Sequence, residues 1–175
     1  RAGQFVRVLA DPKGELIPLT LADWDAKAGT ITLVVQNMGT TTIRINGMRV
    51  GQALAGIAGP LGRPSELHRH DDSETVVFTA GGLGLPPVYP IMREHLRLGN
   101  HVTLISGFRS ADLMFWDGPS ERIGRIKAEY GDQLDVIYAT NDGSVGVQGF
   151  VTTPLEGLLN AARDGRGRPI AEVVT

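Results

Sequence analysis

The strongest structural signal in the chain is the segment Val76-Val77-Phe78-Thr79-Ala80-Gly81-Gly82-Leu83-Gly84-Leu85-Pro86-Pro87. Its first residues form a continuous apolar run, which is typical of a strand buried on both faces of a parallel sheet. Three glycines come next, and the two prolines suit the first turn of a helix, where a missing N–H breaks no hydrogen bond. The segment therefore predicts a strand, a tight turn and a helix, in that order.

The same rhythm continues to the end of the chain. Each of three apolar runs is followed by a segment of helical length. The pairs are 75–79 with 86–98, 102–106 with 120–130, and 136–140 with 153–163. Strands and helices that alternate in this way predict an open parallel sheet covered by helices, so we expect an α/β domain over residues 75–175.

The residues before this domain follow a different pattern. Short strand candidates alternate with turn segments such as Asp11-Pro12-Lys13-Gly14, and no long helix interrupts them. The candidate strands are 4–9, 16–21, 30–36 and 41–45. Short strands at this spacing predict an antiparallel β-barrel over residues 1–62. Residues 63–74 are polar and have no period, so they are expected to be a linker, and the predicted fold class is a two-domain β + α/β protein.

Composition excludes several classes of function. Among 175 residues, 17 are Lys or Arg and 19 are Asp or Glu, and the formal net charge of -2 gives no support to nucleic-acid binding. Cysteine is absent, which excludes disulfides, thiol nucleophiles and any iron–sulfur cluster held by these residues themselves. No run approaches the roughly 18 apolar residues of a membrane span.

The two ends of the chain lead to expectations about location and completeness. Arg1-Ala2-Gly3-Gln4-Phe5-Val6 lacks the basic and then apolar profile of a signal peptide, so a cytoplasmic protein is expected. The chain also begins without Met inside a strand-like alternation, and it stops in the apolar run 170–175. We therefore expect both domains to be truncated, the first at its N-terminal strands and the second in its C-terminal part.

The glycine-rich turn at 81–84 carries the clearest chemistry. Where a strand brings bare backbone to the start of a helix, the free N–H groups and the helix dipole favour a phosphate. The spacing is not Gly-x-Gly-x-x-Gly, but Gly-Gly-x-Gly in this context still predicts a nucleotide site. The alternative is a tight turn that uses glycine only to reach a positive φ.

Four segments, taken together, resemble the ferredoxin–NADP reductase superfamily. Residues 81–91 are similar to its pyridine-nucleotide loop, and Gly3-Gln4-Phe5-Val6 is similar to the strand before its flavin motif. Residues 17–23 stand where the superfamily carries that motif, and Gly59-Pro60-Leu61-Gly62 matches the end of its flavin barrel.

Two later segments, 140–144 and 146–152, extend this pattern over the whole chain. The whole pattern most resembles the electron-transfer subunits of the superfamily. These include the electron-transfer subunit of dihydroorotate dehydrogenase, the β-subunit of sulfide dehydrogenase and the small subunit of NADH-dependent ferredoxin:NADP oxidoreductase.

The resemblance implies that the β-domain binds FAD. The residues expected around the flavin ring are Pro18, Leu19, Thr20, Leu21 and Ala22. Those expected at the ribityl and adenosine side and at the diphosphate are Val35, Gln36, Asn37, Thr41 and Thr42. Ile17 departs from the superfamily, where an Arg usually meets the flavin pyrophosphate. Without the resemblance, an alternating strand and a Thr-rich sheet edge explain the same residues.

The resemblance also implies that the α/β domain binds NAD(P)H at the carboxyl edge of its sheet. The residues expected there are Gly81, Gly82, Leu83, Gly84, Leu85, Pro86, Arg109, Ser110, Asn141, Asp142 and Gly143. Arg109 suits a 2′-phosphate or an adenine ring, but the similar subunits use NADH with a comparable segment, so NADH and NADPH both stay open. The alternatives are a solvated loop charge at Arg109 and an Asx turn at 141–143.

One cluster invites a metal interpretation. In His68-Arg69-His70-Asp71-Asp72, alternate residues of an extended chain face one way and carboxylates follow. Because the segment falls in the predicted linker and has no further ligand set, we expect a solvated linker and no metal site. No catalytic side chain is predicted either, because the redox chemistry of such proteins belongs to their cofactors.

These observations lead to one leading hypothesis and one alternative. The leading hypothesis is an FAD-containing, NAD(P)H-dependent oxidoreductase that serves as an electron-transfer subunit. Hydride is exchanged between nucleotide and flavin, and electrons pass to an iron–sulfur centre or to a larger partner subunit. The resemblance implies a [2Fe–2S] cluster in a segment after the end of this chain. The alternative is a regulatory or scaffold module that binds flavin or nucleotide without turnover.

Overall fold

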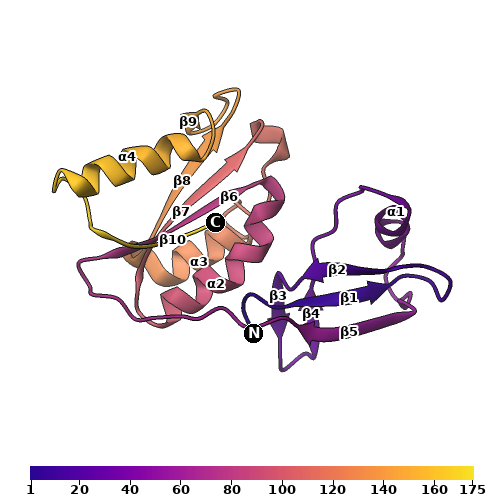
Figure 1. Ribbon diagram of the computed structural model, residues 1–175. Helices are drawn as coiled ribbons and strands as arrows, with labels where there is room; N and C mark the ends of the chain where they lie inside the picture. Colours follow the sequence, from indigo (N-terminus) through magenta and orange to yellow (C-terminus); the bar gives the residue numbers. More distant parts are fainter.

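The computed structural model describes residues 1–175 and divides into a β-domain and an α/β domain (Figure 1). The predicted fold class is confirmed, since antiparallel sheets precede a five-stranded parallel sheet with helices. An extended segment without helix or strand joins β5, which ends at Leu61, to β6, which begins at Thr75. No helix combines the length and the apolar character needed to cross a membrane.

The parallel sheet of the α/β domain has the strand order β10-β6-β7-β8-β9. Its strands are β6 (Thr75–Gly81), β7 (His101–Phe108), β8 (Leu134–Thr140), β9 (Val147–Gln148) and β10 (Ile170–Val174). β6 pairs with β7 up to Gly81, which lies opposite Gly107, and the last residue of β7, Phe108, pairs with Thr140 of β8. The loops after these three strands therefore meet at one edge of the sheet.

Three helices cover this sheet. They are α2 (Leu85–Arg97), α3 (Arg122–Tyr130) and α4 (Thr152–Arg163), with short 3₁₀ turns at Gly82–Gly84, Ala111–Leu113 and Gly131–Gln133. Helices α2 and α3 pack on one face, and α4 lies on the other (Figure 1). Alternate residues of β6, such as Val76 and Phe78, meet Met92 and Leu96 of α2 in a core of 14 buried residues.

The β-domain is built from two small antiparallel sheets. One contains β1 (Phe5–Leu9), β2 (Leu16–Thr20) and β5 (Gly56–Leu61) in the order β2-β1-β5. The other is the hairpin of β3 (Asp23–Asp25) and β4 (Thr30–Thr32). Its core has three buried residues, which are Val6, Val8 and Leu21.

Two strand predictions in the β-domain are wrong. The predicted strand 30–36 keeps strand pairing only over Thr30–Thr32, and the predicted strand 41–45 is the helix α1 (Thr40–Asn46). Thr and Ile favour strands, but here the Thr42 hydroxyl accepts the backbone N–H groups of Met38 and Gly39 and starts a helical turn. This local hydrogen bonding outweighs the intrinsic preference of the residues.

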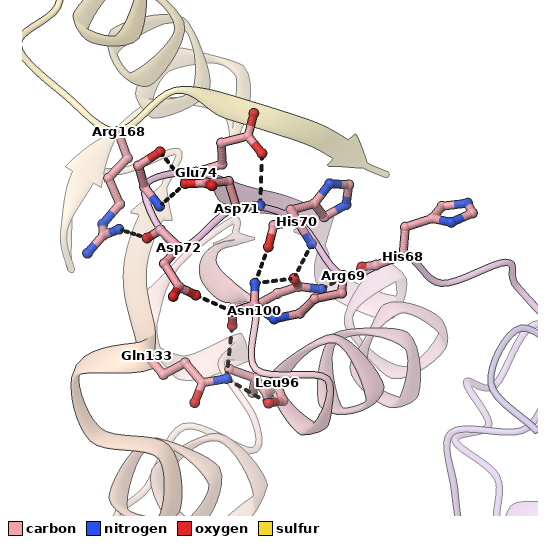
Figure 2. A network of polar contacts seen from close by, with 11 residues as sticks. His68, Arg69, His70, Asp71, Asp72, Glu74, Leu96, Asn100, Gln133 and Arg168 are labelled. Carbon is pink, nitrogen blue, oxygen red and sulfur yellow. Dashed lines mark hydrogen bonds and ion pairs between the residues drawn. The ribbon is translucent and has the colours of Figure 1, made fainter.

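The end of the linker is fastened to the α/β domain by Asn100 (Figure 2). The Asn100 Oδ1 accepts the backbone N–H of His70 at 2.8 Å, and its Nδ2 donates to the His68 carbonyl at 2.7 Å. Gln133 supports the same turn by donating to the carbonyls of Leu96 and Asn100. The prediction of a solvated segment is therefore wrong for His70, which is half-buried and stacks on the ring of the buried His95.

Candidate functional site

A cavity of about 720 Å³ lies between the β-domain and the carboxyl edge of the parallel sheet. The β-domain contributes Val34, Val35 and Gln36, and the sheet edge contributes Gly81, Gly82, Leu83, Gly107, Phe108, Arg109, Leu113, Phe115, Asn141, Gly149, Phe150 and Val151. Its volume falls within the range of small-molecule and cofactor sites. The strand order places it where the loops after β6, β7 and β8 converge.

The loop after β6 presents bare backbone to this cavity. Gly82 has a positive φ of +50°, which an L side chain rarely adopts, so the turn itself favours a glycine at this position. A Cβ atom added at Gly81 or Gly82 meets nothing within 4 Å. The two positions thus leave room for a ligand to approach the backbone just before α2, and Leu83 stands beside them at the cavity wall.

Three neighbouring residues of the predicted loop pack within the domain and do not line the cavity. Leu85 and Pro86 are buried in the first turn of α2, where Leu85 joins the main core. A Cβ atom added at Gly84 would lie 4.0 Å from the Ala80 side chain. None of the three lines the cavity, so they orient the loop from behind.

The end of β7 brings an arginine and two aromatic walls to the cavity. Arg109 is exposed and is the one charged residue among those that line the cavity. Phe108 packs edge-to-face on Phe115 at 5.6 Å between ring centroids. Ser110 is half-buried and comes just before the 3₁₀ turn Ala111–Leu113, outside the lining.

The loop after β8 combines a ligand-facing residue with an Asx turn. Asn141 lines the cavity, whereas the Asp142 Oδ1 accepts the backbone N–H and the hydroxyl of Ser144 at 3.0 and 2.7 Å. These hydrogen bonds lower the pKa of Asp142. Gly143 supplies the positive φ of +75° at this turn. The Asx-turn interpretation therefore holds for Asp142 and Gly143.

The residues predicted for the flavin occupy two places in the β-domain. Pro18, Leu19 and Thr20 lie on β2, and the buried Leu21 and Ala22 follow directly. Val35 and Gln36 line the cavity, while Asn37 accepts a hydrogen bond from Asn46 at 2.6 Å. Thr41 and Thr42 lie in the first turn of α1, close behind Gln36 in the chain.

Sequence reasoning missed about half of the cavity lining. The missed residues are Val34, Gly107, Phe108, Leu113, Phe115, Gly149, Phe150 and Val151. Gly107 is the most informative of them, because a Cβ there would lie 2.4 Å from the Val151 side chain. A glycine directly after an apolar run was a usable signal that another segment comes close to the backbone there. No signal in the sequence indicated that Val151, from the loop before α4, is the residue that does so.

The histidines of the linker belong to a separate cluster. The His70 Nε2 lies 3.4 Å from the Glu172 carboxylate of β10, and His95 is close to both. Burial lowers the pKa of His95, and its Nδ1 lies 3.0 Å from the Asn100 Nδ2. Because the Asn100 amide is oriented by the linker backbone, His95 must accept this hydrogen bond at Nδ1 and carry its proton on Nε2. The lone pair of this tautomer lies on Nδ1, where it accepts from Asn100, and Nε2 carries the proton, so the geometry favours a structural role for His95 over metal binding.

The rest of the predicted metal motif is dispersed. Asp72 pairs with Arg69, and His68 is exposed and contributes its backbone carbonyl to Asn100. Asp71 accepts the backbone N–H and the hydroxyl of Ser73, and these hydrogen bonds lower the pKa of Asp71.

Comparison with known proteins finds electron-transfer subunits. The dihydroorotate dehydrogenase B (NAD(+)) electron transfer subunit homolog of Thermotoga maritima is 34% identical over 159 residues, which cover 91% of this chain and 52% of the relative. The dihydroorotate dehydrogenase B (NAD(+)) electron transfer subunit of Shouchella clausii is 32% identical over 153 residues, covering 86% and 55%. The chain thus spans about half the length of the curated relatives it matches. No protein-family profile matches it.

A solved structure gives the same result at the level of the fold. The NADH-dependent reduced ferredoxin-NADP oxidoreductase, described for flavin-based electron bifurcation, superposes with a TM-score of 0.78 at 27% identity. The match covers 99% of this chain and 65% of that one. In sequence and in fold, these similarities match the ferredoxin–NADP reductase superfamily that the motifs predicted.

Proposed function

We propose that this chain binds FAD in its β-domain and NAD(P)H at the sheet edge of its α/β domain, as part of an electron-transfer subunit. The observation that carries the proposal is the cavity with one wall at Val34–Gln36 and the other at Gly81–Leu83. A ligand in this cavity touches both domains. The relatives, which are electron-transfer subunits, support this assignment of the two cofactors.

The residues of the sheet edge fit a dinucleotide. The open backbone at Gly81 and Gly82 suits phosphate oxygens, because no Cβ stands in the way. Asn141 can hydrogen-bond to a ribose or a carboxamide, and Phe108 and Phe115 give apolar walls that exclude water. The Arg109 guanidinium suits a phosphate, with which it can pair, or an adenine ring, on which it can stack.

The residues of the β-domain fit a flavin less completely. Thr20 is exposed at the end of β2 and offers a hydroxyl, while Val35 and Gln36 stand at the cavity. The Thr42 hydroxyl already makes three hydrogen bonds within its own turn. We therefore assign its role at a diphosphate to the shape of the loop, with backbone N–H groups as the direct donors.

The chemistry of the cavity agrees with electron transfer. When bound, the flavin and the nicotinamide supply the redox step, a hydride exchange followed by release of single electrons to an acceptor. The lining contains no Asp, Glu, His or Lys, so the chain offers no group there for general acid–base catalysis. Its residues position the rings and keep water out.

A larger partner subunit completes this proposal. The relatives are named as electron transfer subunits, which implies another subunit that receives or supplies the electrons. A [2Fe–2S] cluster on that path requires ligands from outside these 175 residues, because they contain no cysteine.

The decisive experiment loads the chain with FAD and mixes it anaerobically with NADH or NADPH in a stopped-flow instrument. Loss of the flavin absorbance at a saturable rate supports the proposal. Failure to bind supplied FAD would favour the scaffold alternative. A strong preference for NADPH that disappears in Arg109→Ala would show 2′-phosphate recognition, and equal rates with both nucleotides would remove that role from Arg109.

A matched pair of glycine variants tests the cavity directly. Gly81→Val fills open space without strain, since Gly81 has a φ of −104°. We expect it to weaken nucleotide binding more than tenfold while FAD stays bound. Gly157→Val on α4 also meets open space, away from the cavity, and should leave nucleotide binding unchanged. Equal nucleotide affinity in both variants would contradict a site at Gly81.

A further inference from the structure

A largely buried carboxylate joins the β-domain to two helices of the α/β domain. Asp23, the first residue of β3, is 14% exposed. Its Oδ1 accepts a hydrogen bond from Arg93 on α2, and its Oδ2 accepts one from Arg122 on α3. Because two guanidinium groups share one carboxylate, neutralising Asp23 leaves two cations facing each other at low exposure. We call these three residues the interdomain anchor.

Three aromatic rings enclose the interdomain anchor. The Arg93 guanidinium lies 5.0 Å from the centroid of the Trp24 ring, and the Arg122 guanidinium lies 4.9 Å from that of Trp116. Tyr89 lies within 6.0 Å of both guanidinium groups. Burial raises the pKa of Tyr89, so its ring stays a neutral phenol. Such cation–π contacts hold the planes of both arginines in addition to the ion pairs.

The backbone of Trp116 provides a second, independent observation. It is the one residue other than glycine with a positive φ, at 69°. A bulky side chain rarely adopts this conformation, and it persists where the surroundings hold it in place. Here the Trp116 carbonyl accepts the N–H of Ile123 at 2.7 Å, and the ring packs against Tyr89 and Phe115 at 5.5 Å each. Trp116, held in this rare conformation, thus supports Arg122 of the anchor.

The interdomain anchor is connected to both walls of the cavity. On the β-domain side, Arg122 also donates to the Thr32 hydroxyl at 3.2 Å, and the cavity wall Val34–Gln36 begins two residues later. On the other side, Trp116 packs on Phe115, which lines the cavity. A shift of the anchor therefore moves one wall relative to the other.

We propose that Asp23 is a positioning residue that sets the spacing of the two domains across the cavity through Arg93 and Arg122. The anchor itself touches neither cofactor. It holds the β3–β4 hairpin against α2 and α3, so that the wall at Val34–Gln36 faces the sheet edge at one distance. The proposal rests on the proposed function only where it concerns transfer between two cofactors.

A distance measurement tests the positioning role without any cofactor. The full chain contains no cysteine, so spin labels on Val50→Cys and Glu129→Cys report only the spacing between the fully exposed β-domain residue and α3. By double electron–electron resonance we expect a narrow distribution, which broadens and shifts in Asp23→Asn. Asp23→Glu keeps the carboxylate and should restore a narrow distribution. Asp25→Asn, on the same strand but exposed, is the matched control.

The outcomes are separable from those of the proposed function. An unchanged distribution in Asp23→Asn overturns the positioning role, whether or not FAD binds. Circular dichroism and urea unfolding of the α/β core check that the variant is folded. In the FAD-loaded chain, we expect Asp23→Asn to slow flavin reduction by NAD(P)H by on the order of tenfold to 10²-fold while the nucleotide Kd is unchanged. A loss of nucleotide affinity with an unchanged maximal rate would also overturn the role.

Discussion

The α/β domain and the β-domain differ in how much of a core each builds. In the α/β domain, 14 buried residues from the sheet and from helices α2 and α3 form one cluster. In the β-domain the cluster has three, namely Val6, Val8 and Leu21, and helix α1 buries none of its residues. A domain of this size with so small a core gains little stability from apolar burial.

The difference teaches where the geometry of the cavity comes from. The sheet edge is held from within, by parallel strands in register and by the helices that cover them. The β-domain wall is held by side-chain hydrogen bonds at its turns and, at Asp23, by two arginines of the other domain. We therefore expect the β-domain to respond to perturbation sooner than the α/β domain.

The largest expected effect comes from the main core. Leu104→Ala removes a fully buried side chain of β7 and should lower the free energy of unfolding by about 2–5 kcal/mol. Val8→Ala in the β-domain should cost about 2 kcal/mol, because fewer methylene equivalents are lost. Urea unfolding followed by tryptophan fluorescence separates the two, since Trp24 lies in the β-domain and Trp116 in the α/β domain. Equal losses at both tryptophans would mean that the domains unfold as one unit.

The second effect concerns the fastening of the linker. Asn100→Ala leaves the His70 N–H and the His68 carbonyl without these partners. Each unsatisfied group costs about 1–3 kcal/mol, so the free energy of unfolding should fall by about 3 kcal/mol. Trypsin should then cut after Arg69 faster than in the parent chain. The matched control, Asn46→Ala, removes exposed hydrogen bonds in the β-domain and should cost about 1 kcal/mol without changing cleavage at Arg69.

The third effect depends on pH. Burial lowers the pKa of His95 below its ordinary value of 6.5, so the unfolded chain takes up a proton there before the folded chain does. The contribution of His95 to the free energy of unfolding is fully present above pH 6.5, and it is lost as the pH falls through the lowered pKa of the folded chain. Each unit of lowering corresponds to about 1.4 kcal/mol. Thermal unfolding between pH 7.5 and 5 should show this slope, and His95→Gln should flatten it; an identical slope in the variant would assign it to other groups.

The smallest effect is expected at the surface of the β-domain. Val50 is fully exposed, so Val50→Ser should change the free energy of unfolding by less than about 0.5 kcal/mol. A larger loss, measured by the same urea unfolding, would show that this thin domain depends on residues outside its three-residue core.

Much of the α/β domain followed from local pattern. The segments 75–79 and 86–98 correspond to β6 and α2 within two residues, because a continuous apolar run and a proline-started helix are signals confined to a few neighbouring residues. The open backbone at Gly81 and Gly82 followed from the same signal. The β-domain was less predictable, since the Thr-rich segment at 41–45 favours a strand until the Thr42 hydroxyl closes a helical turn.

Two parts of the site had no local signal. Phe115 reaches the cavity from a loop, and the course of that loop depends on packing against the sheet rather than on a helical or strand periodicity. Asp23, Arg93 and Arg122 are ordinary charges in the sequence, and the hydrogen-bonded pairs are separated by 70 and 99 residues. Ion pairs between residues so far apart in the chain leave no periodic pattern in the sequence.

Neighbouring residues were thus enough to predict the strands and helices of the α/β domain, the glycine-rich turn and the resemblance to the superfamily, because backbone propensity and hydrophobic period act over a few positions. The cavity, the hydrogen bonds between Asn100 and the linker, and the interdomain anchor form only when distant segments pack together. The contacts of Asn100 and of the interdomain anchor form because polar groups at low exposure need hydrogen-bond or ion-pair partners, which distant segments supply.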